Sequence, residues 1–307
     1  MLPLVEKYRP TKIEDCILPK DIKKTFKDII RTGDVPNMIL AGGAGCGKTT
    51  VAKAMCSELG LDMMFINASE DGGIDTLRTK IRNFASTVSL SGGKKVVILD
   101  EADYLNPQST QPALRGFIEE FAANCRFVMT CNFKSRIIDP LHSRCSVIDF
   151  KIPAKEKPQL AKEFLDRAKF IMDSEGIKYD EKSIAGVILK HFPDFRKVLN
   201  VVQRHSVSGE VTSGVLVSEI SISALVESMK KKDFVGIRKW AAENSDKDMA
   251  SVYRSIYDGL CEVMPPASLA QAILVIAEYQ YKSAFVADQE INLVACCLML
   301  ASDCQFA

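Results

Sequence analysis

A glycine-rich octapeptide limits what this chain can fold into more than any other segment: Gly42-Gly43-Ala44-Gly45-Cys46-Gly47-Lys48-Thr49. It fits the pattern G-x-x-x-x-G-K-[S/T], which binds phosphate when a strand precedes it and a helix follows it. Both are predicted here, a strand over residues 37–40 and a helix from Lys48 to Leu59. Glycines let backbone N–H groups wrap around phosphate oxygens, and the N-terminus of the helix favours the same anion. The octapeptide therefore predicts a nucleotide site.

The side chains of this loop have separate tasks. Lys48 supplies a positive charge for the β- and γ-phosphates, and Thr49 supplies a hydroxyl for Mg²⁺. We expect the phosphates to be bound by Gly45, Cys46, Gly47, Lys48, Thr49 and Thr50. The plainer interpretation is a glycine-rich turn that caps an ordinary helix, and the complete match of pattern and context disfavours it.

Short apolar runs alternate with helix-length segments over the first half of the chain. The runs are Met38–Leu40, Met63–Ile66, Val96–Leu99, Phe127–Met129 and Val147–Ile148. This order predicts an α/β fold with a mostly parallel sheet and helices on both faces. No strand is predicted after Phe150, and helical patterns continue to about His205. A Ser- and Gly-rich stretch, 206–216, then precedes further helices, so we predict three domains: 1–152, 153–213 and 214–307.

Composition narrows the class of protein. With 307 residues, 47% hydrophobic and 26% charged, the chain has the make-up of a globular protein of two or three domains. Its ten cysteines contain no C-x-x-C pair, which favours free thiols in a reducing compartment over disulfides or zinc. The longest apolar stretch, residues 291–301, is about half a bilayer span, so we expect no membrane association and a cytoplasmic protein.

Charge is unevenly spread along the chain. Residues 214–307 hold 8 Lys and Arg against 12 Asp and Glu, whereas residues 1–213 hold 32 against 27. The basic excess therefore lies in the part that carries the motifs, which permits nucleic-acid binding.

A second acidic motif follows a wholly apolar strand. Val96–Leu99 suits a central parallel strand, and Asp100-Glu101 stands at its carboxyl end. Asp100 can hold Mg²⁺, while Glu101 can orient and deprotonate the water that attacks the γ-phosphate. Such a base indicates a hydrolase rather than a P-loop kinase. A solvated acidic turn is the alternative interpretation of an isolated Asp-Glu pair.

With Lys48, Asp100 and Glu101 present, the chain resembles an AAA+ ATPase, and its other motifs resemble the clamp-loader branch of that class. The likeness is to the small subunits of replication factor C and to the ATPase subunit of T4-type phage clamp loaders. It implies an AAA+ P-loop domain, a small helical lid, an all-helical collar that joins subunits, and ATP with Mg²⁺ as cofactors. The opening Glu6-Lys7-Tyr8-Arg9-Pro10 resembles the family's adenine-pocket segment. That match implies base contacts from Val5, Glu6, Lys7, Tyr8 and Ile17.

Three further matches imply catalytic roles. Asn132 corresponds to the sensor that couples the γ-phosphate to Glu101, although an Asn there can equally be a helix cap. Ser143-Arg144-Cys145 resembles the motif whose arginine reaches the nucleotide of the neighbouring subunit. Without that resemblance Arg144 is a surface arginine. Arg196 resembles the second sensor, which extends from the lid to the phosphates.

A basic segment is the candidate DNA contact. Residues 74–95 hold five Lys and Arg, Lys95 among them, and one Asp. The resemblance makes the helix within them track a DNA backbone, with Arg78, Lys80 and Arg82 facing phosphates and Arg115 on a helix that couples DNA to Glu101. A solvated helix face is the alternative. Val88 and Leu90 match the family's clamp contact, or pack a loop core.

The implied partners are a sliding clamp, primer-template DNA, identical subunits and an accessory subunit of the clamp loader. The last helix, residues 290–302, is apolar nearly all round and is expected to be buried. An initiator or helicase loader shares every phosphate motif but requires a duplex-reading module, and none is visible. A non-catalytic stator is disfavoured by Lys48, Glu101, Asn132 and Arg196.

Overall fold

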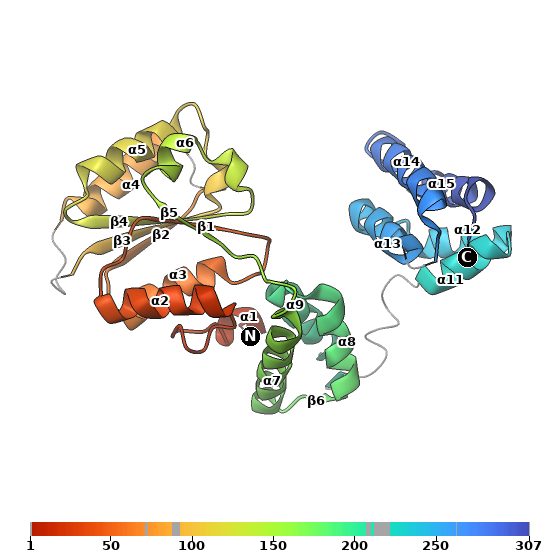
Figure 1. Ribbon diagram of the computed structural model, residues 1–307, viewed down its shortest axis with the longest axis horizontal. Coiled ribbons are helices and arrows are strands. Elements are labelled where there is room, and N and C mark those ends of the chain that lie inside the picture. Colours follow the sequence, from red (N-terminus) through yellow and green to blue (C-terminus); the bar gives the residue numbers. More distant parts are fainter. Residues whose placement is uncertain are drawn as a thin grey trace. The chain divides into compact units, whose positions relative to one another are not determined.

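The computed structural model describes residues 2–70, 73–87, 93–206, 210–211, 222–261 and 263–306. Its contacts divide the chain into two compact units, residues 1–215 and residues 216–307 (Figure 1). The predicted linker, 206–216, lies almost wholly outside the described residues, as do the predicted clamp contacts Val88 and Leu90. Each unit is considered by itself.

The first unit is built on a five-stranded parallel sheet. Its strands are β1 (Met38–Ala41), β2 (Met63–Asn67), β3 (Lys95–Asp100), β4 (Cys125–Cys131) and β5 (Ser146–Asp149). They lie in the order β2-β3-β4-β1-β5, with Met38 opposite both Val128 and Ser146. Since all strands are parallel, the ends of β1, β3 and β4 meet at one edge. The predicted α/β fold is confirmed.

Helices cover both faces of this sheet (Figure 1). One face carries α2 (Lys20–Thr32) and α3 (Lys48–Glu58); the other carries α4 (Ile74–Ala85), α5 (Thr110–Glu120) and α6 (Asp139–His142). Short 3₁₀ turns, η1 (Ala102–Tyr104) and η2 (Lys134–Arg136), follow β3 and β4. The strands between two helical layers bury both faces, which explains why β3 is apolar throughout rather than alternating.

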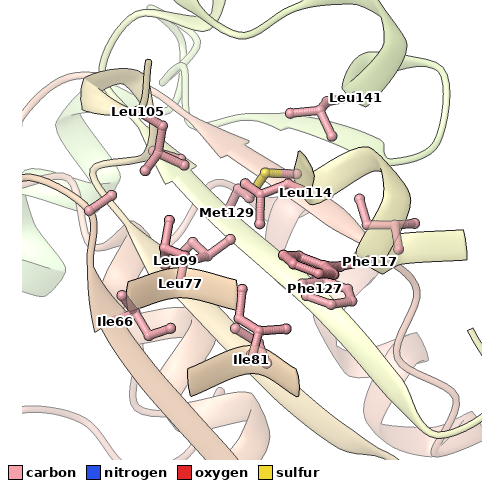
Figure 2. Close-up of a cluster of buried hydrophobic side chains, with 14 of the residues drawn as sticks. Ile66, Leu77, Ile81, Leu99, Leu105, Leu114, Phe117, Phe127, Met129 and Leu141 are labelled. Carbon is pink, nitrogen blue, oxygen red and sulfur yellow. The ribbon is translucent and has the colours of Figure 1, made fainter. Parts of the chain in front are cut away.

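Successive β3 side chains enter different cores. Val97 and Leu99 pack with α4 and α5, whereas Val96 and Ile98 pack with α2 and α3. Figure 2 shows the first core, in which side chains of the helices meet those of the strands. Its labelled members are Ile66, Leu77, Ile81, Leu99, Leu105, Leu114, Phe117, Phe127, Met129 and Leu141. The helices on the two faces fix the position of the sheet, including the edge at which β1, β3 and β4 end.

A three-helix bundle completes the first unit. It consists of α7 (Lys157–Glu175), α8 (Glu181–His191) and α9 (Phe195–Ser206). Gly176 ends α7 in the left-handed conformation, and the Asp180 carboxylate accepts a hydrogen bond from the Ser183 N–H to cap α8. The short helix α1 (Leu4–Lys7) lies against this bundle and contacts α9 (Figure 1).

The expectation that no strand follows Phe150 is wrong in one detail. Two-residue strands, β6 (Lys178–Tyr179) and β7 (Glu210–Val211), pair in parallel beside the bundle. A pair this short has no periodic pattern in the sequence, because its geometry follows from the packing of the helices around it.

The second unit is helical throughout its described residues. Its helices are α11 (Ile222–Lys230), α12 (Phe234–Asn244), α13 (Met249–Cys261), α14 (Pro266–Lys282) and α15 (Gln289–Asp303). Inside, the Asn292 amide donates to the Tyr253 hydroxyl at 2.8 Å and to the Tyr279 carbonyl at 3.1 Å. These bonds satisfy the one amide that interrupts the apolar last helix.

The expectation that this last helix is buried all round is wrong. One face of α15 packs on α11, α12 and α14, whereas Ile291, Leu298 and Met299 are exposed. No element among the described residues of this unit covers that second apolar face. Among the described helices, none is both long and apolar enough to cross a membrane.

The first core sets a stability prediction. Phe127→Ala should lower the free energy of unfolding by about 3–5 kcal/mol, because it leaves a cavity between β4 and α5. Phe127 is 1% exposed. Hydrogen exchange of the β3 and β4 amides under native conditions measures the loss. The control is Phe133→Ala, whose side chain is 57% exposed, and it should change the free energy of unfolding by less than about 0.5 kcal/mol. Equal losses of stability in the two variants would contradict the buried position of Phe127.

Candidate nucleotide site

The phosphate loop lies between β1 and α3, as predicted. Gly47 has a φ of 94° and precedes the first residue of α3. Lys48 is 8% exposed, and its ammonium donates to the Gly42 and Gly43 carbonyls at 2.8 and 2.7 Å. Its third partner is the Asn132 side-chain oxygen at 3.0 Å. Lys48 is thus held at the centre of the loop, beside the predicted sensor.

Asp100, at the end of β3, joins three elements of the site. Its Oδ1 accepts hydrogen bonds from the Thr49 hydroxyl and from the Thr130 hydroxyl, each at 2.6 Å. Thr130 also accepts the Glu101 N–H at 3.1 Å. One carboxylate therefore aligns the loop after β1, the end of β3 and the end of β4.

Glu101 has a backbone conformation that is rare for a side-chain-bearing residue. Its φ is 56° and its ψ is 42°, in the left-handed region. Such conformations cost free energy and persist where the surroundings impose them, commonly in active sites. Here the imposing contact is the bond to Thr130, and Glu101 lines the cavity described below.

The sensor loop is anchored by a buried carboxylate. Asp103, 6% exposed, accepts the Asn132 and Phe133 N–H groups through Oδ2, both at 3.2 Å. These bonds fix the backbone of Asn132, whose side chain reaches Lys48. Asp103 therefore links the turn after β3 to the turn after β4.

One cavity collects most of the predicted nucleotide residues. Its polar end is lined by the phosphate loop, Asp100, Glu101, Asn132 and Arg196. Its apolar end is lined by Val5, Tyr8, Ile17, Phe164, Ile171, Phe195 and Leu199. An apolar wall opposite a few charged groups suits a planar base at one end and phosphates at the other.

Three predicted residues lie elsewhere. Neither Glu6 nor Lys7 lines the cavity: Glu6 pairs with Arg9, and Lys7 pairs with Glu175. Cys46 is buried under the loop, 3.9 Å from the Lys48 ammonium, and burial raises the pKa of its thiol. Direct contacts from these three side chains to a nucleotide stay predictions.

The residues fit a magnesium nucleotide. A Thr hydroxyl and an Asp carboxylate stand together at the polar end, and both are oxygen ligands of the kind Mg²⁺ prefers. Within the described residues no group of three or more His, Cys, Asp or Glu could hold a metal alone. An ion at Thr49 and Asp100 would therefore take its other ligands from phosphate oxygens and water, and would neutralise phosphate charge.

Arg144 does not belong to this cavity. It precedes β5, whose first residue pairs with Met38, so it lies at the opposite edge of the sheet from the phosphate loop. Its Nε and Nη2 donate to one Glu119 oxygen at 2.8 and 2.6 Å, and Nη1 donates to the Pro140 carbonyl at 2.9 Å. These contacts hold the pKa of Glu119 below its usual range.

The four candidate DNA residues occupy α4 and α5. Leu77 and Ile81 fix the buried face of α4, and Arg78, Lys80 and Arg82 stand on its exposed side. Arg82 lies 3.5 Å from Glu120, and Arg115 lies 3.7 Å from Glu119. Lys95 is different: it is 6% exposed and donates to the Phe84 carbonyl and the Thr87 hydroxyl. A buried, bonded lysine cannot contribute to a basic surface.

The fold and the site together define a P-loop ATPase. A phosphate loop between a strand and a helix, the Asp100 carboxylate, the adjacent Glu101 and the Asn132 amide stand at one sheet edge. This is the arrangement that nucleotide hydrolysis requires.

Comparison with known proteins narrows the class. Residues 38–153 match the ATPase family associated with various cellular activities, and residues 156–217 match the lid domain of sliding-clamp-loader large subunits. The sliding-clamp-loader large subunit of Enterobacteria phage T4 is 36% identical over 310 residues, covering 99% of this chain and 97% of the relative. The replication factor C small subunit of Archaeoglobus fulgidus is 35% identical, covering 73% and 70%. The chain belongs to the family of sliding-clamp-loader large subunits.

A likeness to solved structures supports the fold alone. A variant of RuvB from Thermotoga maritima superposes with a TM-score of 0.56 at 17% identity, covering 73% of this chain and 80% of that chain.

Sequence reasoning missed the residues that hold the catalytic ones. Thr130, Asp103 and Glu119 position Asp100, Asn132 and Arg144, respectively. Strand register is the signal that could have found Thr130, because Leu99 pairs with Met129 and the next residue of each strand is therefore adjacent. No strand register points to Glu119, because it lies on α5 and its partner Arg144 follows α6.

Thr130 generates a prediction. Thr130→Val keeps the shape of the side chain but removes the hydroxyl that orients Asp100 and Glu101. We expect ATP turnover to fall about tenfold, because Asp100 loses one donor and the Glu101 N–H loses its acceptor, with little change in ATP affinity. Steady-state hydrolysis and calorimetric binding measure the two quantities. Thr130→Ser, which keeps the hydroxyl, should retain turnover; equal losses in both variants would contradict the role given to the hydroxyl.

Proposed function

We propose that this clamp-loader ATPase is the hydrolysing motor that opens a sliding clamp and places it on primer-template DNA. The observation that supports this most is a division of the catalytic groups. Lys48, Asp100, Glu101 and Arg196 surround one cavity, whereas Arg144 stands at the opposite edge of the sheet. Each subunit would thus bind ATP with its own residues and need a neighbour to hydrolyse it.

Hydrolysis assigns a task to each residue at the polar end. Lys48 and Arg196 offset the charge of the phosphates, and Thr49 with Asp100 holds Mg²⁺. Glu101 accepts the proton of the attacking water, and Asn132 aligns that water with the γ-phosphate. The left-handed backbone of Glu101 supports this assignment, because it turns the carboxylate into the cavity while Asp100 stays on Thr49.

Arg144 completes the site of an adjacent copy. An arginine that approaches the transferring phosphoryl neutralises developing charge and contributes about 10³–10⁵ in rate. In the isolated chain its guanidinium is occupied by Glu119 and Pro140. Assembly must therefore exchange the Glu119 contact for phosphate oxygens, which makes hydrolysis depend on how subunits are seated.

DNA would reach the site through α4 and α5. Arg78, Lys80 and Arg82 lie on the exposed side of α4, and Arg115 on α5 follows the turn that carries Glu101 and Asp103. Contacts of arginine and lysine to phosphates position a duplex without reading its sequence. That suits a machine acting at any primer junction.

The second unit would join the subunits, with 1–152 as the nucleotide domain, 153–213 as the lid and 214–307 as the collar. Its described surface leaves large apolar side chains uncovered, including Ile291 on α15, Leu274 and Tyr281 on α14, and Phe285 shortly after α14. Exposed apolar clusters of this kind mark protein contacts. Identical subunits and an accessory subunit are the partners this predicts, in the cytoplasm where ten free thiols persist.

The first test is stimulation. ATP hydrolysis by the assembled protein should rise at least about tenfold when a clamp and primed DNA are added together, since both align the subunits. Phosphate release measures it. Glu101→Gln should bind ATP as tightly but remain inactive under all conditions, because the base is missing. A rate that ignores clamp and DNA would refute clamp loading, and turnover by Glu101→Gln would refute the base.

The second test separates action in cis from action in trans. Arg144→Ala should lower hydrolysis in the assembly by about 10³-fold and leave ATP affinity of the single chain unchanged. Mixing this variant with a Lys48→Ala chain should restore part of the activity. The Lys48→Ala chain lacks the lysine of its own site but still supplies Arg144 to a neighbour. Arg31→Ala, at an exposed arginine of α2, is the control. If Arg144→Ala lowers the ATP affinity of the single chain as much as it lowers hydrolysis in the assembly, action on a neighbour is excluded.

A further inference from the structure

Residues 4–8 pack with the lid, although about 150 residues separate the two in sequence. Leu4 is 5% exposed and lies in one apolar cluster with Phe164, Ala168 and Val202 of α7 and α9. By contrast Ile13, Cys16 and Leu18 belong to the core between the sheet and α2. The chain therefore passes from the lid to the sheet between residues 9 and 12.

Helix α1 cannot set its own shape. It has four residues, too few for an isolated helix to be stable. Both of its ends are held by lid side chains: the Leu4 N–H donates to the Gln203 amide oxygen at 3.0 Å, and Arg167 donates to the Tyr8 carbonyl at 3.2 Å. The lid thus determines where Val5 and Tyr8, which line the apolar end of the cavity, are placed.

Glu175 contacts two residues of this N-terminal segment at once. One of its oxygens accepts hydrogen bonds from the Lys7 ammonium and from the Tyr8 hydroxyl, each at 2.5 Å. Its side chain is only 10% exposed. Glu175 is the last residue of α7, where the helix dipole disfavours a carboxylate. Its place is explained by its partners on the N-terminal segment rather than by the stability of α7.

We propose that residues 4–8 are a structural part of the lid, and that Glu175 is a positioning residue which, through Lys7 and Tyr8, sets how tightly the cavity holds the nucleotide base. The inference rests on the proposed nucleotide site. In this proposal the lid and residues 4–8 hold the nucleotide base, and residues at the end of the sheet hold most of the triphosphate. The contacts to the base would therefore move with the lid.

The hydrogen bonds of Glu175 with Lys7 and Tyr8 do not change near neutral pH. The hydrogen bonds from Lys7 and then Tyr8 lower the pKa of Glu175, while the bond to Glu175 raises the pKa of both donors. A lowered carboxyl pKa means that the contact weakens only as the solution becomes acidic. All three groups therefore keep their charge states through the neutral range, and base affinity should not titrate there.

The test separates the base from the phosphates. In the full chain, Glu175→Gln should weaken ATP binding about three- to tenfold, because a neutral amide oxygen accepts more weakly from the Lys7 ammonium and the Tyr8 hydroxyl than the carboxylate does. Binding of inorganic tripolyphosphate, which has no base, should change less than about twofold. Tyr8→Phe, which removes only the hydroxyl, should show the same pattern and guards against a folding defect in the first variant. Turnover of Glu175→Gln at saturating ATP should stay within about twofold of the wild type.

A matched control lies in the same lid. Glu181 on α8 pairs with Lys169 on α7 and touches no part of residues 4–8. Glu181→Gln should leave both affinities unchanged. If Glu175→Gln weakens ATP and tripolyphosphate equally, Glu175 acts on the lid as a whole and the inference is overturned; no change in ATP affinity overturns it too. A wild-type chain that binds tripolyphosphate but not ATP would instead refute the proposed function.

Discussion

Two hydroxyls that share one carboxylate oxygen hold the nucleotide site together. Thr49 comes from the loop after β1 and Thr130 from β4, and both donate to Oδ1 of Asp100 at the end of β3. Three strands that are far apart in sequence are thereby tied at their carboxyl ends. Because Thr130 also holds the N–H of Glu101, the proposed metal ligand Asp100 and the proposed base Glu101 cannot move independently. The layered cores around β3 matter for function because they keep these ends in register.

A second contact joins the lid to the phosphate loop, and it depends on a missing side chain. A Cβ on Gly45 would lie 1.7 Å from the Asp194 carboxylate, which caps α9 by accepting the Lys197 N–H. The Gly45 carbonyl in turn accepts the Phe195 N–H at 3.2 Å. The glycine is therefore needed for the lid as well as for phosphate. Arg196 follows directly, so its approach to the cavity is set by the fit of α9 on the loop.

The sequence predicts this molecule well where a pattern is local and poorly where partners are distant. The five strands carry apolar runs, and Lys48, Asp100 and Glu101 stand in motifs whose spacing follows from the backbone. Lys95 shows the opposite case: a count of charges assigns it to a basic segment, yet it is buried against Phe84 and Thr87. Asp103 and Glu119 were missed because their partners come from other turns. The exposed face of α15 was missed because an apolar helix has the same composition whether a neighbour covers it or not.

Four of the described helices, α3, α5, α7 and α15, end in a carboxylate against their own dipoles, and at the ends of α5 and α7 this carboxylate pairs with cations of other segments. Glu119 and Glu120 end α5 and pair with Arg144, Arg115 and Arg82. Glu175 ends α7 and pairs with Lys7 and Tyr8. A carboxylate at a helix C-terminus is destabilising by itself, so each depends on cations from other segments. Under the proposed function, drawing such a cation toward DNA phosphates or a neighbour's nucleotide would expose that cost again. The ends of α5 and α7 are therefore where rearrangement of one contact is transmitted to another.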